Sequence, residues 1–358
     1  MSNFAINLLA FKGMDSITQI TLGSAIGVAV MGRHTKLWKA ALWGAVAGTT
    51  PDLDTVVRYG NDVLNMTRHR AESHAIYYLT CLSPILGLAV TGIHKEWKLY
   101  LRWVICFWLV FMTHIGIDYL TIYGTQLLQP FSNHPFGLGS IFIIDPAYTL
   151  PLLIGLMVTL IFRSPHRLRW NTIGLAVSSL YLAWGVYAQQ LVTAQVKQDL
   201  PTDRIDHLMV SAGPLNSILW RVVAISPSHY YEAWVSLLDK EKKMSWTKHD
   251  RGAPLIAEHA TNPSVASIQA FSHGIYRMHE TPSGVYITDL RMGAEPSYFF
   301  DFNLGKPDAR GQLDPNFAAI KQGSRPDIKM ALPWVWSRIW DQQTPPPWMA
   351  NQSSLNQK

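Results

Sequence analysis

The first half of the chain contains six apolar segments that approach the length needed for a helix to span a bilayer, about 20 residues. They cover residues 16–32, 37–55, 74–93, 101–120, 147–162 and 172–190. Backbone polar groups within lipid must be satisfied inside the segment itself, so such runs predict membrane helices. The first two segments are rich in Gly, Ala and Ser, which permits close helix packing but weakens the spanning signal. Whether these two cross the membrane fully is left open.

Composition changes after the sixth segment, where the chain becomes polar and proline-rich. Strand-like runs at 266–278, 285–290 and 297–302, separated by turn sequences at 281–284 and 293–296, predict an antiparallel sheet. Residues 216–224 and 229–238 are compatible with helix or strand. The expected fold class is mainly α: a multi-pass transmembrane helical domain (1–195) is followed by a smaller soluble α+β domain (196–342). A disordered tail is expected at 343–358.

Positive charge is distributed in a way that orients the helices. Lys and Arg gather in the short connections at 33–39, 95–102 and 163–169, which marks these loops as cytoplasmic. The expected location is therefore a bacterial inner (plasma) membrane, with the carboxy-terminal domain extracytoplasmic. The net charge of +6 comes without a basic stripe interleaved with aromatics, so the predicted partner is the lipid bilayer and not nucleic acid. Oligomeric state is left open.

Short polar clusters fall at the other, outside ends of the apolar segments. His114 and Asp118 are four residues apart, so both can reach one metal ion from one helical face. The candidate metal ligands are Asp15, Asp52, Asp54, His69, His74, His114 and Asp118. Imidazole nitrogen and carboxylate oxygen without sulfur favour a divalent metal, zinc first. Seven candidates exceed one tetrahedral shell, so one ion with supporting residues, or two ions, are both compatible with the sequence.

Each cluster also has a simpler explanation. Asp15 suits a helix N-cap, the sequence around Asp52 and Asp54 suits a turn, and the stretch from His69 to His74 suits an interfacial cap. Independent caps need not converge on one membrane face, which favours the metal interpretation. Five residues separate His69 from His74, about 140° apart on a continuous helix, so we expect His69 in a loop and His74 in the first turn of the third helix.

The polar motifs at 14–19, 51–54, 69–74 and 114–118 together resemble the YdjM-like bacterial inner-membrane proteins, in their long form with a soluble carboxy-terminal half. The stretches 123–131, 142–146, 214–221 and 289–293 look similar to the same group. The resemblance implies a metal-dependent hydrolase, distantly similar to zinc-dependent phospholipase C and single-strand nucleases, and hence phosphoester chemistry. One position departs from the pattern: Gln19 stands where the family commonly has His, which favours a supporting role there and leaves its effect on activity open.

The leading hypothesis is a membrane-embedded hydrolase whose metal activates a water at the outer face, acting on a phosphoester, including one carried by a lipid. Glu72, or an Asp that does not bind the metal, is the expected general base, and Arg70 or Arg68 is expected to hold a phosphate. The alternative is a membrane scaffold or regulatory interaction protein with a structural metal site. A closed four-ligand shell would favour the scaffold, and an open position the enzyme. A transporter fits less well, because the polar residues lie at helix ends and not at mid-membrane.

Overall fold

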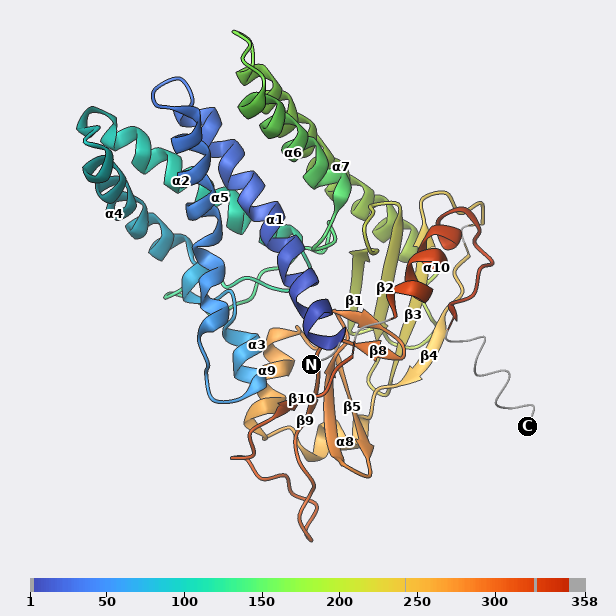
Figure 1. Cartoon of the computed structure of the whole chain (residues 1–358). Coiled ribbons are helices and arrows are strands. Elements are labelled where there is room, and N and C mark those ends of the chain that lie inside the picture. Colours follow the sequence, from blue (N-terminus) through green and yellow to red (C-terminus); the bar gives the residue numbers. More distant parts are fainter. Residues whose placement is uncertain (1–2, 242, 325–326, 348–358) are drawn as a thin grey trace. The chain divides into compact units, whose positions relative to one another are not determined.

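The computed structural model describes residues 3–241, 243–324 and 327–347, with backbone alone for 3–15. The chain divides into two compact units (Figure 1): the first comprises 1–57 and 70–185, and the second comprises 58–69 and 186–358. Helix α7 (Leu168–Val196) contributes its first part to one unit and its last part to the other.

The first unit is built from helices. Every apolar segment predicted from the sequence is helical, as α1 (Asn3–Met31), α2 (Leu37–Thr49), α4 (Ile76–His94), α5 (Tyr100–Leu120), α6 (Pro146–Ile161) and α7. By length and apolar composition, Ile76–His94 and Trp97–Leu120 are candidate membrane spans, whereas Ser16–Met31 and Pro146–Ile161 are shorter apolar helices. The described structure therefore supports two spans where the sequence predicts six.

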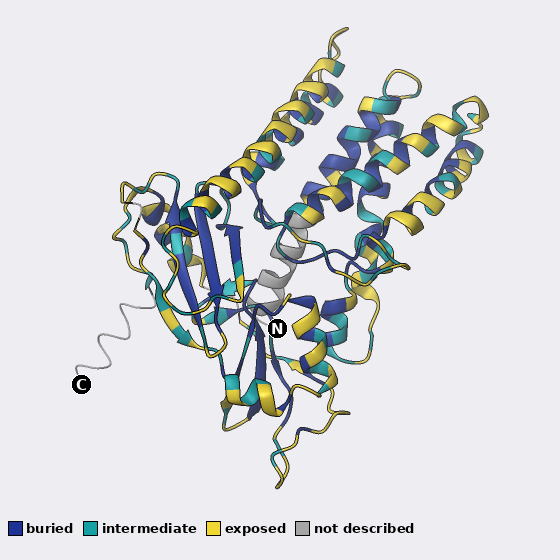
Figure 2. Ribbon diagram, turned by 180° about the vertical axis from the view of Figure 1, so that it is seen from behind, coloured by how far each residue is buried: buried dark blue, intermediate teal, exposed yellow. Residues whose placement is uncertain are grey.

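The outer faces of these helices are exposed (Figure 2), and many of their exposed side chains are apolar. On α4, for example, Ile85, Leu88 and Ile93 are more than half exposed, at 62%, 55% and 63%. Large apolar patches are uncommon on the water-exposed surface of monomeric proteins. This face is therefore suited to contact with lipid.

Helices α1 and α2 meet through their backbones. A Cβ atom added at Gly23 would lie 2.3 Å from the carbonyl oxygen of Gly44, and one added at Gly48 would lie 2.6 Å from that of Gln19. Only glycine permits this approach, as expected from the small-residue composition of the two segments. Bulky side chains of α5, including Trp103 and Phe107, form the core beside this pair.

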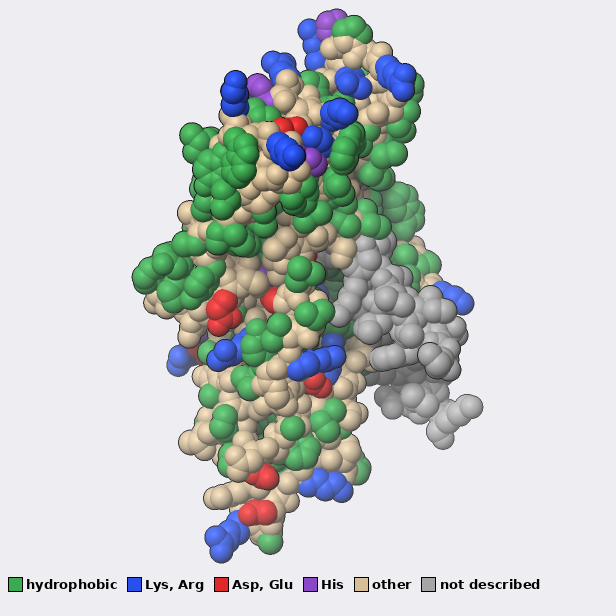
Figure 3. All heavy atoms as spheres, turned by 60° about the vertical axis from the view of Figure 1, so that its left-hand side comes forward, with side chains coloured by type: hydrophobic (Ala, Val, Ile, Leu, Met, Phe, Trp, Pro, Cys, Tyr) green, Lys and Arg blue, Asp and Glu red, His purple; other side chains and the backbone are tan. Residues whose placement is uncertain are grey.

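Lys, Arg and His side chains gather at one end of the helices, beyond a band of hydrophobic side chains (Figure 3). The connections at this end also contact each other: Lys39 Nζ lies 2.7 Å from the Glu96 carboxylate. The basic loops that the sequence assigns to one membrane face thus share one end of the first unit. The polar motifs containing His74 and Asp118 lie at the opposite end, where α4 begins and α5 ends.

The second unit contains antiparallel sheets, which confirms the predicted sheet domain. One sheet has the order β1 (His207–Ala212), β2 (Leu219–Ile225), β3 (His229–Ser236) and β4 (Thr247–Asp250); the other has the order β10 (Ile320–Lys321), β9 (Asp301–Asn303), β6 (Gly284–Asp289) and β5 (Tyr276–Thr281). Strands β7 (Gly293–Ala294) and β8 (Ser297–Tyr298) pair separately. Val192 of α7 packs in one core cluster with Val222 and Ala233, which face each other across β2 and β3.

The remaining elements of this unit are helices α3 (Asp62–Arg68), α8 (Ala253–Glu258), α9 (Pro263–Phe271) and α10 (Ile328–Trp340). The strand predicted at 266–278 is wrong over its first part, which forms α9. The Asn262 side chain accepts a hydrogen bond from the Ser264 amide, and Pro263 occupies the first helical position, so a strong helix start overrides the β pattern. Of the tail predicted to be disordered, residues 348–358 lie outside the described residues.

Candidate metal centre

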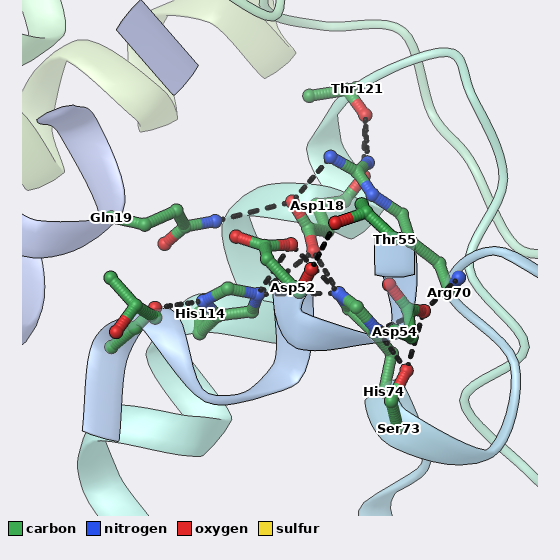
Figure 4. Close-up of polar contacts among 12 residues, drawn as sticks. Gln19, Asp52, Asp54, Thr55, Arg70, Ser73, His74, His114, Asp118 and Thr121 are labelled. Atoms are coloured by element: carbon green, nitrogen blue, oxygen red, sulfur yellow. Dashed lines mark hydrogen bonds and ion pairs between the residues drawn. The ribbon is translucent and has the colours of Figure 1, made fainter. Parts of the chain in front are cut away.

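Four side chains of the first unit converge at the end of α4 and α5 opposite the basic loops (Figure 4). Asp52 comes from the 3₁₀ helix η1 (Pro51–Val56), which Pro51 begins. His74 is the last residue of the short 3₁₀ turn η2 (Glu72–His74), just before α4. His114 and Asp118 project from the last turns of α5, one helical turn apart. One ligand atom from each of the four residues lies within 4.8 Å of the others.

The spacing of these atoms is that of a tetrahedral coordination shell. Zinc bonds to nitrogen and oxygen of about 2.0–2.2 Å imply tetrahedron edges of about 3.3–3.6 Å. His74 Nε2 lies 3.3 Å from both His114 Nε2 and Asp118 Oδ2, and these last two atoms are 3.4 Å apart. Asp52 Oδ1 lies 3.4 Å from the His74 nitrogen and 3.6 Å from the His114 nitrogen. These five of the six edges therefore fit a single tetrahedral ion.

Both imidazole rings are oriented by hydrogen bonds at Nδ1, the ring nitrogen that points away from the centre. His114 Nδ1 lies 2.8 Å from the Gly48 carbonyl oxygen, which can only accept, so Nδ1 donates and Nε2 can present its lone pair to the centre. Behind His74, Ser73 Oγ donates to Asp54 Oδ2 at 2.7 Å and lies 2.8 Å from His74 Nδ1. Because the Ser73 hydroxyl donates its hydrogen bond to Asp54, the serine oxygen accepts one from His74 Nδ1. This fixes in His74 the same tautomer as in His114.

The two carboxylate oxygens of Asp118 have different environments. Its Oδ1 lies 3.1 Å from an Arg70 guanidinium nitrogen and 3.3 Å from Gln19 Nε2. Its Oδ2 is buried and, among the described residues, accepts no hydrogen bond. It lies 3.3 Å from His74 Nε2 and 3.4 Å from His114 Nε2. A buried carboxylate oxygen is costly without compensation, and a cation bound by the four atoms would supply it. The donor set therefore fits a divalent metal.

Asp52 is the most accessible member of the group. Its side chain is 24% exposed, whereas those of His74, His114 and Asp118 are at most 2% exposed. Burial acts to raise the pKa of the Asp52 carboxyl. Hydrogen bonds from the ring nitrogens of His114 and His74, which can form only while no ion is bound to those nitrogens, outweigh burial and hold the pKa below its usual range. Asp52 is thus an anion at neutral pH, and its side of the centre faces solvent.

The other predicted metal ligands are not among the four clustered residues. Asp54 supports the centre: its Oδ2 accepts from the Arg70 amide at 2.9 Å as well as from Ser73. Glu72 begins the η2 turn with an exposed side chain. His69 directly follows α3 in the second unit and is not one of the four. The side chain of Asp15 lies outside the described residues.

The Arg70 side chain is buried, and its guanidinium contacts several neighbouring side chains. Besides Asp118, its guanidinium donates to Thr121 Oγ1 at 3.3 Å and lies over the Tyr123 ring, 5.3 Å from the centroid. Its backbone has a positive φ of 63°, uncommon outside glycine. The structure thus directs Arg70 toward Asp118. Sequence reasoning missed the contributions of Ser73, Gly48 and Thr121; only Ser73, adjacent to His74, carried a local signal.

Fold and site together define a helical protein of membrane type with a candidate divalent-metal centre. The chain belongs to the YdjM inner membrane protein family, whose model matches residues 14–192, and all four clustered residues fall in that range. This confirms the resemblance seen in the sequence. The chain is also similar to "Uncharacterized protein YfhP" of Bacillus subtilis (strain 168), with 26% identity over 244 residues, 63% of this chain and 71% of that protein. No solved structure matches the chain.

Proposed function

We propose that this protein is a membrane metal-dependent hydrolase acting on a phosphoester. The observation that carries the proposal is the tetrahedral spacing of the nitrogen and oxygen atoms of Asp52, His74, His114 and Asp118. One four-atom shell supports one ion, and two imidazoles with two carboxylates favour zinc. When bound, such an ion lowers the pKa of a coordinated water toward neutrality and polarises a phosphoryl oxygen.

The residues around the centre have separate roles in this proposal. Asp52, the least buried of the four, marks the side from which substrate and water approach. Glu72 lies in the same short turn as His74, with an exposed side chain, and is the general base in this proposal. Arg70 and Gln19 hold Asp118 through its Oδ1, which keeps Oδ2 directed at the centre. We therefore assign Arg70 to positioning a ligand, in place of the phosphate-binding role expected from sequence.

The proposal places the centre at the outer face of a bacterial inner membrane, in a multi-pass chain whose carboxy-terminal unit is extracytoplasmic. Support comes from the basic loops, which gather at one end of the helices (Figure 3), whereas the four residues lie at the other end, where α4 begins and α5 ends. Positive loops favour the cytoplasmic side, so the centre would face outward. A lipid-borne phosphoester is the substrate class that this position favours.

A second candidate function is a membrane scaffold with a structural metal site. The specific observation in its favour is that four protein side chains offer ligand atoms to one centre, as in structural zinc sites, whereas catalytic zinc sites commonly use three protein ligands and a water. The two proposals therefore differ in whether a water can join the ion beside Asp52.

The test combines metal content with turnover. Purified protein should carry about one divalent ion per chain, and His114→Ala should lose most of it because a nitrogen ligand is removed. His229→Ala, in β3 of the second unit, should retain it and serves as the control. Absence of metal from the native protein, or equal metal in both variants, would overturn the site.

Two variants, Glu72→Gln and Asp118→Asn, distinguish the enzyme hypothesis from the scaffold hypothesis. Both are assayed with a phosphoester panel in matched detergent. Glu72→Gln should keep its metal but lose on the order of 10²–10⁴-fold in rate, because proton transfer is impaired. Asp118→Asn should lose metal affinity because it removes a charge that offsets the cation. A metal-loaded native protein inactive on every phosphoester, with four protein ligands and no water by X-ray absorption, would favour the scaffold.

A further inference from the structure

A group of large, exposed, uncharged side chains lies beside the metal centre; we call it the aromatic tip. It consists of Tyr77, Tyr78, Leu128 and Phe131, which are 49%, 38%, 46% and 80% exposed. The Phe131 ring packs edge-on against Tyr77 with centroids 5.9 Å apart, and the two tyrosine rings are 5.4 Å apart. Residues 126–132, which carry Leu128 and Phe131, include no charged side chain. Phe131 is the most exposed of the large hydrophobic side chains in the described structure.

The position of the aromatic tip along the helices follows from α4. This candidate span has 19 residues, and at 1.5 Å per residue it is about 28 Å long, close to the hydrocarbon thickness of a bilayer. Tyr77 and Tyr78 lie in its first turn and therefore at one membrane boundary if α4 spans. The Ile76 amide donates to the Leu127 carbonyl at 3.0 Å, so the loop bearing Phe131 is held at the same level.

We propose that the aromatic tip inserts into the head-group layer of the bilayer and holds the metal centre at that depth. Lipid is the occupant that the structure favours, because the tip continues the exposed apolar surface of α4, formed by Ile85 and Leu88. Tyrosine is enriched at membrane boundaries, where its ring is buried and its hydroxyl stays wet. Phe131 has no polar atom to keep in water, so it gains from entering the acyl boundary.

The aromatic tip and the centre share a backbone connection. The Gln126 amide donates to the Arg70 carbonyl at 2.9 Å, and Arg70 in turn binds Asp118. His74 lies two residues before α4, so the turn that presents it leads directly into the tip. If the proposed hydrolase activity holds, its substrate class is then the phosphodiester of a membrane phospholipid, reached without the lipid leaving the bilayer.

The test places an environment-sensitive fluorophore on Phe131→Cys in the full chain, reconstituted in phosphatidylethanolamine–phosphatidylglycerol vesicles. Cys81 is exposed and is replaced by serine, whereas Cys106 is buried and remains. The control is Ala309→Cys, on an exposed loop of the second unit. The fluorophore at 131 should show blue-shifted emission and quenching by lipids brominated near the head group, and the control should show neither.

Water-like emission at position 131 in vesicles would overturn the anchor. A blue shift without quenching by lipid would also overturn it, because it would mean that a protein surface or a second copy of the chain covers the tip.

A second arm tests the substrate class with Phe131→Ser. Cleavage of vesicle phospholipid should fall about tenfold, from the lost burial of one aromatic ring, while a soluble dinitrophenyl phosphodiester should be cleaved as by the native protein. Equal loss on both substrates, or on neither, would overturn the lipid assignment. A quenched fluorophore in a protein that cleaves neither substrate would uphold the anchor and refute the proposed activity instead.

Discussion

The contact between α1 and α2 yields a specific prediction for the metal centre, tested with Gly48→Ala. The new Cβ would lie 2.6 Å from the Gln19 carbonyl oxygen, whereas ordinary contact begins at 3.4 Å, so the helices must separate by about 0.8 Å (3.4 minus 2.6). Each helix holds a different ligand: the Gly48 carbonyl accepts from His114 at 2.8 Å, and Gln19 donates to Asp118 at 3.3 Å. Separation must therefore stretch at least one of these hydrogen bonds.

The size of the effect follows from the distances. A shift of 0.8 Å along the His114 bond would lengthen it from 2.8 Å to about 3.6 Å, beyond hydrogen-bonding range. Loss of such an orienting partner typically reduces metal affinity by about 10–100-fold. Overpacking of the helix pair adds a cost of about 1–3 kcal/mol to the free energy of folding.

The control for this variant is Gly116→Ala, on α5 between His114 and Asp118. A Cβ at Gly116 would meet no atom within 4 Å in the described structure, so this change should leave the affinity intact and stabilise the helix by up to about 1 kcal/mol. Affinity is measured by zinc competition against a chelator, and stability by thermal unfolding in the same detergent. If Gly48→Ala binds zinc as tightly as Gly116→Ala, the orienting role of the α1–α2 contact is refuted.

Three further predictions concern the rest of the chain. Asp239→Ala should destabilise the second unit by about 3–5 kcal/mol, because it leaves the buried Arg338 guanidinium, 2.7 Å from Asp239, without its counter-ion; unchanged denaturant unfolding would contradict this. Burial lowers the pKa of His249 below its usual 6.5, so the unfolded chain binds its proton first as pH falls. Stability should therefore decrease below about pH 6.5, and His249→Gln should reduce the difference in Tm between pH 7.5 and 5.5; an unchanged difference would exclude His249 as the cause. Finally, reporter fusions after residue 190 and within 163–169 should report opposite sides of the membrane, and a shared side would refute the proposed orientation.

The four-residue cluster was accessible from sequence because its signals are local. His114 and Asp118 share a helical face by spacing alone, and Asp52 and His74 each belong to a short polar motif. Which of the neighbouring carboxylates points inward was not accessible. Asp54 is turned toward the Arg70 amide and Ser73 instead, and those hydrogen bonds depend on how η1 and the turn before α4 pack together.

The fold was predicted to a similar degree and for similar reasons. Long apolar segments predicted the positions of the helices, and turn sequences predicted much of the sheet. Hydropathy did not distinguish helices that meet the criteria for crossing a membrane from shorter ones such as α6. In the second unit, the start signal at Asn262 and Pro263 competed with a β-rich composition, and the helix cap prevailed.

The chemical identity of the donor atoms has a consequence for where this protein can operate. Many metal centres depend on thiolates, which oxidants convert to disulfides or sulfenic acids, so their ion is lost when the compartment becomes oxidising. Here the four donors are imidazole nitrogens and carboxylate oxygens, and of the two cysteines, Cys106 is buried in the helical core and neither belongs to the cluster. Such a donor set would retain a bound ion across redox conditions, including those of the oxidising cell exterior to which the proposed orientation assigns this centre.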